Sequence, residues 1–279
     1  AGVVHVLYGS ADGLQATGSG GPASQLWTED GINLFNSSAW SLFGEALAVG
    51  DFDGDGRADL AIGSPWKGSP NPQWGAAGHG AVTVLYGWSQ GLQAAGTGAA
   101  RAAQGFTQLV AGIAGTPHPG DDFGSSLIAG DFNGDGHADL AIGVPGESLG
   151  KGSAGIVHAI YGSYEGLKPV GNSDAPPSQW WNQEDTGAGA VEANDRFGTS
   201  LGAGDFDGDG YVDLVIGVPF ESAARGAVHV VYGSFAGLDV DGVVPAQLWM
   251  QSTPGVANSP QPGDRFGTAF GSAPAGGSR

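Results

Sequence analysis

The stretch DFDGDGRADLAIGSP, residues 51–65, decides the fold, because it joins an acidic glycine-rich loop directly to an apolar strand. It recurs as DFNGDGHADLAIGVP at 131–145 and as DFDGDGYVDLVIGVP at 205–219. A Phe-Gly pair precedes each copy, and a further pair stands near the end of the chain: Phe43-Gly44, Phe123-Gly124, Phe197-Gly198 and Phe266-Gly267. Successive pairs are 69 to 80 residues apart. This long period indicates one unit of several strands that is copied along the chain.

A second marker, a β-rich run that ends in Tyr-Gly, occurs four times. The runs are GVVHVLYGS at 2–10, GAVTVLYGW at 80–88, GIVHAIYGS at 155–163 and GAVHVVYGS at 226–234, and a Gly-Leu pair follows each one. Together with the apolar segments that flank each acidic loop, they describe short antiparallel strands separated by Gly, Pro, Asn and Asp. We therefore predict an all-β fold, a β-propeller built from four-stranded antiparallel blades.

The repeats also predict the domain organisation. We expect a single propeller domain over residues 1–279, with three complete repeats and one split, incomplete repeat. The expected repeats are about 1–42 (partial), 43–122, 123–196, 197–265 and 266–279 (partial). Two arrangements are compatible with this pattern, a small four-bladed ring and a piece of a longer array of blades, and we favour the second.

Composition narrows the classes of function. The formal charge of −19, from 28 acidic and 9 basic residues, makes nucleic acid an unsuitable partner, because phosphate backbones repel such a surface. The chain has no Cys, which excludes disulfides and thiolate metal sites. It has no apolar run of about 18 residues, so we expect no membrane insertion. A start at Ala1 without a leader segment is what we expect of a processed protein or an excised fragment.

The acidic loops carry the predicted chemistry. Side-chain oxygens stand at positions 1, 3, 5 and 9, glycine at position 6 permits a sharp bend, and the main-chain oxygen at position 7 is a further ligand. Such close carboxylates repel each other unless a cation lies between them. We predict three Ca²⁺ sites, held by the side chains of Asp51, Asp53, Asp55 and Asp59 with the Arg57 carbonyl; of Asp131, Asn133, Asp135 and Asp139 with the His137 carbonyl; and of Asp205, Asp207, Asp209 and Asp213 with the Tyr211 carbonyl.

Other readings of these loops fit less well. Mg²⁺ demands tighter octahedral geometry, and Zn²⁺ prefers His or Cys ligands, which lack a suitable spacing here. An EF-hand would need Glu at position 12, where Ile62, Ile142 and Ile216 stand, and would have helical flanks. A plain solvated turn explains a single loop, but not three copies in register.

Phe-Gly, then GDFDGDGRADLAIGSP or its two variants, then a VxVxYG strand, resembles the FG-GAP repeat of the integrin α-chain propeller and its bacterial relatives. The resemblance covers almost the whole chain. It implies the same Asp and Asn ligands, in a hairpin loop of each blade. It also implies a ring of typically seven blades, which is more than this chain holds, and its units are longer than is usual in the family.

The remaining polar and aromatic residues give weaker indications. His5, His158 and His229 share one repeat position with Thr83, which favours a structural role. No combination of Ser, His and Asp indicates a catalytic triad, so we predict no catalytic residues. Trp27, Trp180, Trp181 and Trp249 recur before Phe-Gly pairs and are expected to pack. The less regular Trp66, Trp74 and Trp88 are expected to be more exposed, and Asn36-Ser37-Ser38 is a formal glycosylation acceptor.

We expect a non-enzymatic, calcium-binding recognition or adhesion module, located outside the cell or on its surface. Its partner would be a protein or glycan ligand, and further blades or domains of a larger chain are another potential partner. The alternative is a polysaccharide-active enzyme, a lyase or hydrolase, or a lectin on the same scaffold. The enzyme would need His, Arg, Tyr or carboxylates that converge outside the metal loops.

Overall fold

The computed structural model describes residues 2–18, 21–35, 40–68, 78–96, 100–187 and 189–270. Trp74, the acceptor at Asn36-Ser37-Ser38 and most of the last predicted repeat, 271–279, lie outside these residues.

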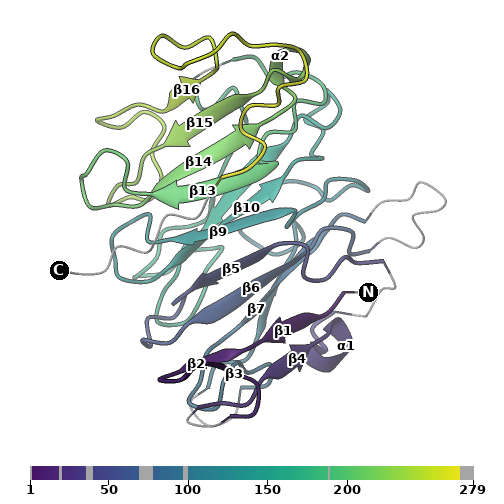
Figure 1. Cartoon of the computed structure of the whole chain (residues 1–279), viewed down its shortest axis with the longest axis vertical. Coiled ribbons are helices and arrows are strands. Elements are labelled where there is room, and N and C mark those ends of the chain that lie inside the picture. Colours follow the sequence, from purple (N-terminus) through teal and green to yellow (C-terminus); the bar gives the residue numbers. More distant parts are fainter. Residues whose placement is uncertain are drawn as a thin grey trace.

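Three four-stranded antiparallel sheets, called blades 1, 2 and 3 below, form the body of the molecule (Figure 1). Blade 1 contains β5 (Leu47–Gly50), β6 (Asp59–Ser64), β7 (Ala81–Leu85) and β8 (Gln104–Phe106). Blade 2 contains β9 (Ser126–Gly130), β10 (Asp139–Val144), β11 (Ile156–Ile160) and β12 (Gln179–Trp181). Blade 3 contains β13 (Ser200–Gly204), β14 (Asp213–Val218), β15 (Ala227–Val231) and β16 (Gln247–Trp249). The predicted all-β fold with four-stranded blades is confirmed.

The N-terminal unit is an incomplete blade. Its strand β1 (Val4–Val6) pairs with β4 (Gln25–Trp27), and β2 (Tyr8–Ser10) pairs with β3 (Gly13–Gln15). Val4 faces Trp27 in the same register as Val157 faces Trp181 in blade 2, so β1 and β4 correspond to the third and fourth strands of a blade. Two four-residue helices complete the described elements, α1 (Glu29–Ile32) and α2 (Glu221–Ala224).

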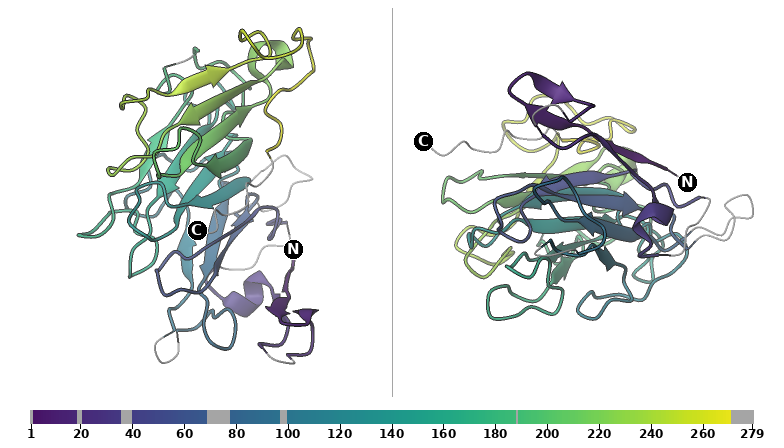
Figure 2. Two further views of the ribbon diagram at one scale, coloured as in Figure 1. Left: turned by 60° about the vertical axis from the view of Figure 1, so that its left-hand side comes forward. Right: turned by 90° about the horizontal axis from the view of Figure 1, so that it is seen from below.

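The blades stack in chain order, with the N-terminal unit at one end and blade 3 at the other (Figures 1 and 2). Among the first strands, β9 contacts both β5 and β13 along this stack, as the inner strands of neighbouring propeller blades do. In the described residues the stack is open, and the N-terminal unit does not join blade 3. Residues 266–270, the described part of the last predicted repeat, therefore lie apart from the N-terminal unit.

The hydrophobic core lies between the blades. The second strands β6, β10 and β14 are buried along their whole length, which explains why the sequence after each acidic loop is continuously apolar. Phe123 and Phe197 of the Phe-Gly pairs are fully buried at the junctions before blades 2 and 3. Each buried side chain of this size contributes about 1.5–3 kcal/mol of hydrophobic free energy.

A polar clasp connects each of the first three Tyr-Gly runs to the Gly-Leu pair of the next unit. At the junction of blades 1 and 2, the Tyr86 hydroxyl donates to Gln104 Oε1 and accepts a hydrogen bond from the Leu167 N–H at 3.2 Å. Gln104 Nε2 in turn donates to the Leu167 carbonyl at 3.2 Å. The same clasp is formed by Tyr8, Gln25 and Leu92, and by Tyr161, Gln179 and Leu238. The Tyr-Gly runs and the Gly-Leu pairs thus recur together because hydrogen bonds between them connect neighbouring units at these junctions.

Candidate metal centres

The three acidic loops each connect the first strand of a blade to its second strand, so they lie at the same end of blades 1, 2 and 3. We call them loop 1 (51–59), loop 2 (131–139) and loop 3 (205–213). Glycines at positions 4 and 6 adopt positive φ in every loop, for example 66° at Gly54 and 84° at Gly56 in loop 1. Residues with a Cβ rarely adopt this conformation, which explains the invariant G-D-G spacing of the three copies.

The aspartate at position 9 fixes the shape of each loop. In loop 2, Asp139 is fully buried, its Oδ2 accepts a hydrogen bond from the Phe132 N–H at 2.8 Å, and its Oδ1 accepts one from the Gly162 N–H at 2.8 Å. The carboxylate therefore ties the start of the loop to the glycine of the Tyr-Gly run. The equivalent sets are Asp59 with Phe52 and Gly87, and Asp213 with Phe206 and Gly233.

The aspartates at positions 1 and 5 organise the loop tip. Asp51 accepts hydrogen bonds from the N–H groups of Asp55 at 3.0 Å and Gly56 at 2.8 Å, and Asp55 accepts one from the Arg57 N–H at 2.9 Å. The main chain therefore wraps around the position-1 carboxylate. Asp131 and Asp135 make the same bonds in loop 2. In loop 3, Asp205 accepts from the Gly210 N–H and Asp209 accepts from the Tyr211 N–H, but the second bond of Asp205 comes from the Gly208 N–H.

Three of the predicted ligands converge in two of the loops. In loop 1, one oxygen each of Asp51, Asp53 and Asp59 lies within 4.8 Å of the others, and in loop 3 the same holds for the position-1, position-3 and position-9 carboxylates, Asp205, Asp207 and Asp213. The position-5 side chains, Asp55 and Asp209, are not part of these groups. In loop 2, position 3 is Asn133, whose Oδ1 accepts a hydrogen bond from the Asp135 N–H at 3.1 Å.

The electrostatics of the loops favour a bound cation. Burial raises the pKa of Asp59 to about 7; the hydrogen bond from Gly87 opposes this shift, and repulsion from Asp53 adds to it. Burial likewise raises the pKa of Asp139, Asp131 and Asp213. The buried Asp53 Oδ1 has no hydrogen-bond partner among the described residues. A hard dication with oxygen ligands at about 2.3–2.6 Å would satisfy this oxygen and remove the repulsion, so the donor set fits Ca²⁺.

One basic residue near loop 1 was not foreseen from the sequence. Arg101 Nε donates to Asp53 Oδ2 at 2.9 Å, and its guanidinium lies 5.3 Å from the centre of the Tyr86 ring. Arg101 belongs to the variable stretch before β8, which carries no repeat marker. Because this ion pair occupies Asp53 Oδ2, Asp53 Oδ1 is the oxygen that is available to a cation.

Neighbouring loops also contact each other. The Ala138 N–H of loop 2 donates to the Asp51 carbonyl at 2.8 Å, and a Cβ on Gly54 would come within 2.7 Å of the His137 ring. The Tyr211 ring lies in the same way against Gly134 of loop 2. The position-7 side chains of loops 2 and 3, His137 and Tyr211, which the sequence did not explain, thus pack on the preceding loop.

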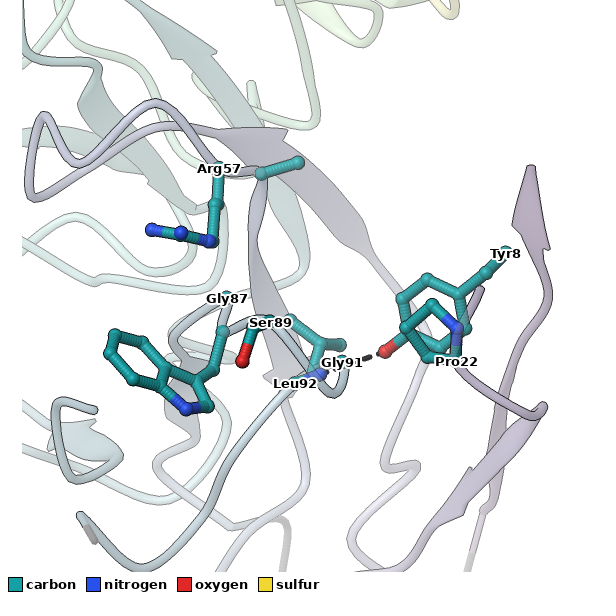
Figure 3. Close-up of a pocket in the computed structure, with 9 residues that line it drawn as sticks. Tyr8, Pro22, Arg57, Gly87, Ser89, Gly91 and Leu92 are labelled. Atoms are coloured by element: carbon teal, nitrogen blue, oxygen red, sulfur yellow. Dashed lines mark hydrogen bonds between the residues drawn. The ribbon is translucent and has the colours of Figure 1, made fainter. Parts of the chain in front are cut away.

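A surface pocket of about 340 Å³ adjoins loop 1 on the side of the N-terminal unit, where Tyr8, Arg57, Trp88 and Leu92 line it (Figure 3). The Arg57 guanidinium lies 5.3 Å from the centre of the Trp88 ring and is paired with Asp55 at 2.8 Å. Among the other tryptophans, Trp181 is buried, as expected for a packing residue, whereas Trp180 is 42% exposed and Trp249 is 38% exposed.

The comparisons with known proteins agree with this geometry. The FG-GAP repeat profile matches residues 43–85, 123–160 and 197–231, one match in each blade. The chain is 35% identical over 190 residues to integrin alpha-PS2 of Drosophila melanogaster, and 34% identical over 214 residues to integrin alpha-7 of Homo sapiens. These alignments cover 66% and 75% of the chain, but 12% and 15% of the relatives.

The chain is also similar to proteins that are not integrins. Phosphatidylinositol-glycan-specific phospholipase D of Rattus norvegicus is 33% identical over 202 residues, which are 70% of the chain and 21% of that protein. Among solved structures, an exotype rhamnogalacturonan lyase aligns with a TM-score of 0.41 and 16% identity over 76% of this chain and 33% of that one. The chain spans only about a fifth or less of the length of the three named sequence relatives.

The chain is an FG-GAP repeat protein of the integrin α-chain-like type, with one repeat in each of its three complete blades. Among the described helices, none is long and apolar enough to cross a membrane.

Proposed function

We propose that this chain is a calcium-stabilised recognition or adhesion module that works outside the cell or at its surface. The observation that carries the proposal is the convergence of carboxylates at positions 1, 3 and 9, within 4.8 Å, in loops 1 and 3. The similarity to integrin α chains and the match of the FG-GAP profile to the segments that contain these loops support the same reading.

In this proposal Ca²⁺ has a structural role. Each ion would join the two ends of a hairpin loop whose position-9 aspartate already holds the Tyr-Gly run of the same blade. Because loops 1 and 2 also contact the following loop, ions at these positions would stiffen one continuous surface. A protein or glycan ligand would then meet loops of fixed shape, which lowers the entropy cost of binding.

A lectin on the same scaffold is the second candidate, and the pocket beside loop 1 favours it. Tryptophan faces and arginine side chains together suit the apolar faces and hydroxyl or carboxylate groups of sugars. Trp88 and Arg57 stand side by side in that pocket.

Binding of the chain to glycan and protein arrays, with and without Ca²⁺, tests the proposal. We expect specific binding that requires Ca²⁺ and is lost when Asp51, Asp131 and Asp205 are all replaced by Ala. Trp88→Ala should abolish binding if the ligand is a glycan held in the pocket beside loop 1, and should leave binding intact if the ligand is a protein that contacts the loops. Array binding that is equal in Ca²⁺ and in chelator would contradict the proposal. Cleavage of an array glycan would instead indicate the enzyme alternative.

A further inference from the structure

A second group of potential metal ligands lies at the opposite end of blade 2 from its acidic loop. Glu147 follows the end of β10, while loop 2 precedes the start of this strand. One ligand atom each of His118, Asp121 and Glu147 lies within 4.8 Å of the others, and His118 Nδ1 is 3.9 Å from Asp121 Oδ2. The two carboxylates are 1% and 6% exposed, whereas the side chain of His118 is 59% exposed and can reorient.

A fourth polar side chain points to the same group. Gln108 is 4% exposed, and its Nε2 donates to Glu147 Oε2 at 2.7 Å. Since both polar atoms belong to one amide, the buried Oε1 also lies beside Glu147, and it has no hydrogen-bond partner among the described residues. An unpartnered buried carbonyl oxygen next to a buried carboxylate indicates a missing positive or donor group.

The equivalent junction before blade 1 contains such a positive group. Counting from the shared markers, Lys67 stands at the repeat position of Glu147, and Glu29 stands at that of Gln108. These two residues form a buried ion pair with Lys67 Nζ 3.1 Å from Glu29 Oε2. The first junction therefore contains a covalently attached cation at the position where the second has a carboxylate.

We infer that His118, Asp121 and Glu147 bind a transition-metal dication of the Zn²⁺ type at the junction of blades 1 and 2. The imidazole nitrogen selects such a metal over Ca²⁺ and Mg²⁺, which prefer all-oxygen sites. Tetrahedral zinc with bonds of about 2.0–2.1 Å brings ligand atoms to about 3.3 Å from one another, so each pair of these atoms has to approach by no more than about 1.5 Å. Gln108 Oε1 or water completes the coordination.

The electrostatics of the junction agree with this assignment. Burial raises the pKa of Asp121, and repulsion from Glu147 adds to the shift, while His118 and His79 oppose it. A dication between the two carboxylates would remove this repulsion and supply the charge that Lys67 provides at the first junction.

Blade 3 offers a matched comparison. Its junction repeats the group as Gln183, Asp195 and Glu221, with Gln183 Nε2 donating to Glu221 Oε2 at 2.6 Å. The backbone turn is also repeated, because the Glu192 N–H donates to Asp195 as the His118 N–H donates to Asp121. Glu192 thus stands where blade 2 has its histidine, and this junction lacks only the nitrogen ligand.

The test is a calorimetric titration of the full chain with ZnCl₂ in saturating Ca²⁺, supported by Co²⁺ absorption spectra. We expect one zinc per chain, an affinity at least about tenfold lower for His118→Asn and Glu147→Gln, and an unchanged affinity for His137→Asn, whose histidine lies in loop 2. Glu192→His should raise the stoichiometry to two. Thermal melts in Ca²⁺ show which variants are folded.

Three outcomes would overturn the inference. These are the absence of zinc binding by the unmodified chain, equal affinity of the folded His118→Asn variant, and loss of binding in His137→Asn, which would place the metal in loop 2. A stoichiometry of one for Glu192→His would show that histidine is not the ligand that distinguishes the two junctions.

Discussion

Loops 2 and 3 have nearly the same sequence, DFNGDGHAD and DFDGDGYVD, but different surroundings. Phe132 of loop 2 is fully buried under blade 3, and its carbonyl accepts a hydrogen bond from the Ser234 N–H at 3.2 Å. Phe206 of loop 3 occupies the same position and is 56% exposed, since among the described residues no blade lies over it. Local sequence thus sets the shape of a loop, and the next blade determines how much the loop contributes to stability.

The largest expected effect concerns the phenylalanine at position 2. Phe132→Ala should lower the free energy of unfolding by about 3–5 kcal/mol, because it leaves a cavity between blades 2 and 3. Phe206→Ala should lower it by less than about 1 kcal/mol, because most of this ring is already in water. Urea unfolding of both variants in saturating Ca²⁺ measures the difference, and equal losses would contradict the comparison.

Substitution of the position-9 aspartate should likewise cost more stability in loop 2 than in loop 3. In Asp139→Asn, an amide N–H replaces an oxygen that accepted a hydrogen bond, so a buried donor loses its partner at a cost of about 1–3 kcal/mol. Asp213→Asn should cost less than half as much, because water reaches the half-buried bond between Asp213 and the Phe206 N–H. Chemical denaturation in chelator isolates this effect from metal binding, and a larger loss in Asp213→Asn would refute it.

A buried histidine on the third strand of blade 2 extends the comparison to pH. Burial lowers the pKa of His158 to about 4 from its ordinary value of 6.5, so the folded state disfavours the charged ring. The stabilisation by neutral His158 is complete above pH 6.5 and is lost as the pH falls toward 4. Thr83 occupies this position in blade 1, which makes His158→Thr a natural control.

Between pH 7 and pH 5, the unmodified chain should therefore lose about 2 kcal/mol more stability than His158→Thr. The difference between the two unfolding curves removes the contributions of carboxylates common to both proteins. Parallel curves over this range would show that His158 is not held neutral by the fold.

The smallest effect concerns the clasp. Tyr161→Phe removes the hydroxyl that accepts from the Leu238 N–H at 2.9 Å, at a cost of about 1 kcal/mol. Tyr232 is the equivalent residue of blade 3, and the described residues contain no next unit whose Gly-Leu pair it could bind, so Tyr232→Phe should be nearly neutral. Thermal unfolding of the two variants measures this difference, and equal shifts would show that the clasp does not stabilise the junction.

Much of the fold was predictable because each repeat marker has a local cause. The acidic loop needs glycines at positions 4 and 6, the following strand is buried on both faces, and Pro ends it. These features appear in any single copy. The ligand positions followed from the oxygen side chains, and the structure brings together positions 1, 3 and 9 in loops 1 and 3. That these residues bind Ca²⁺ stays a prediction.

The contacts between units were not predictable from any single copy. The clasp pairs Tyr86 with Leu167, which lie 81 residues apart, and Arg101 reaches Asp53 from a variable stretch. The sequence nevertheless contained a signal for the clasp, because a Gly-Leu pair recurs after every Tyr-Gly run. The anchoring role of the position-9 aspartate was missed because its partner, the glycine of the Tyr-Gly run, follows at a distance of 20 to 28 residues.

The most direct test of the account is equilibrium unfolding of the chain as a function of free Ca²⁺. We predict that stability rises with concentration, by about 2.7 kcal/mol for each site at 100 times its Kd, and that Asp51→Ala, Asp131→Ala and Asp205→Ala together abolish the rise. Unfolding curves that coincide in chelator and in saturating Ca²⁺ would contradict the assignment of the loops as calcium sites.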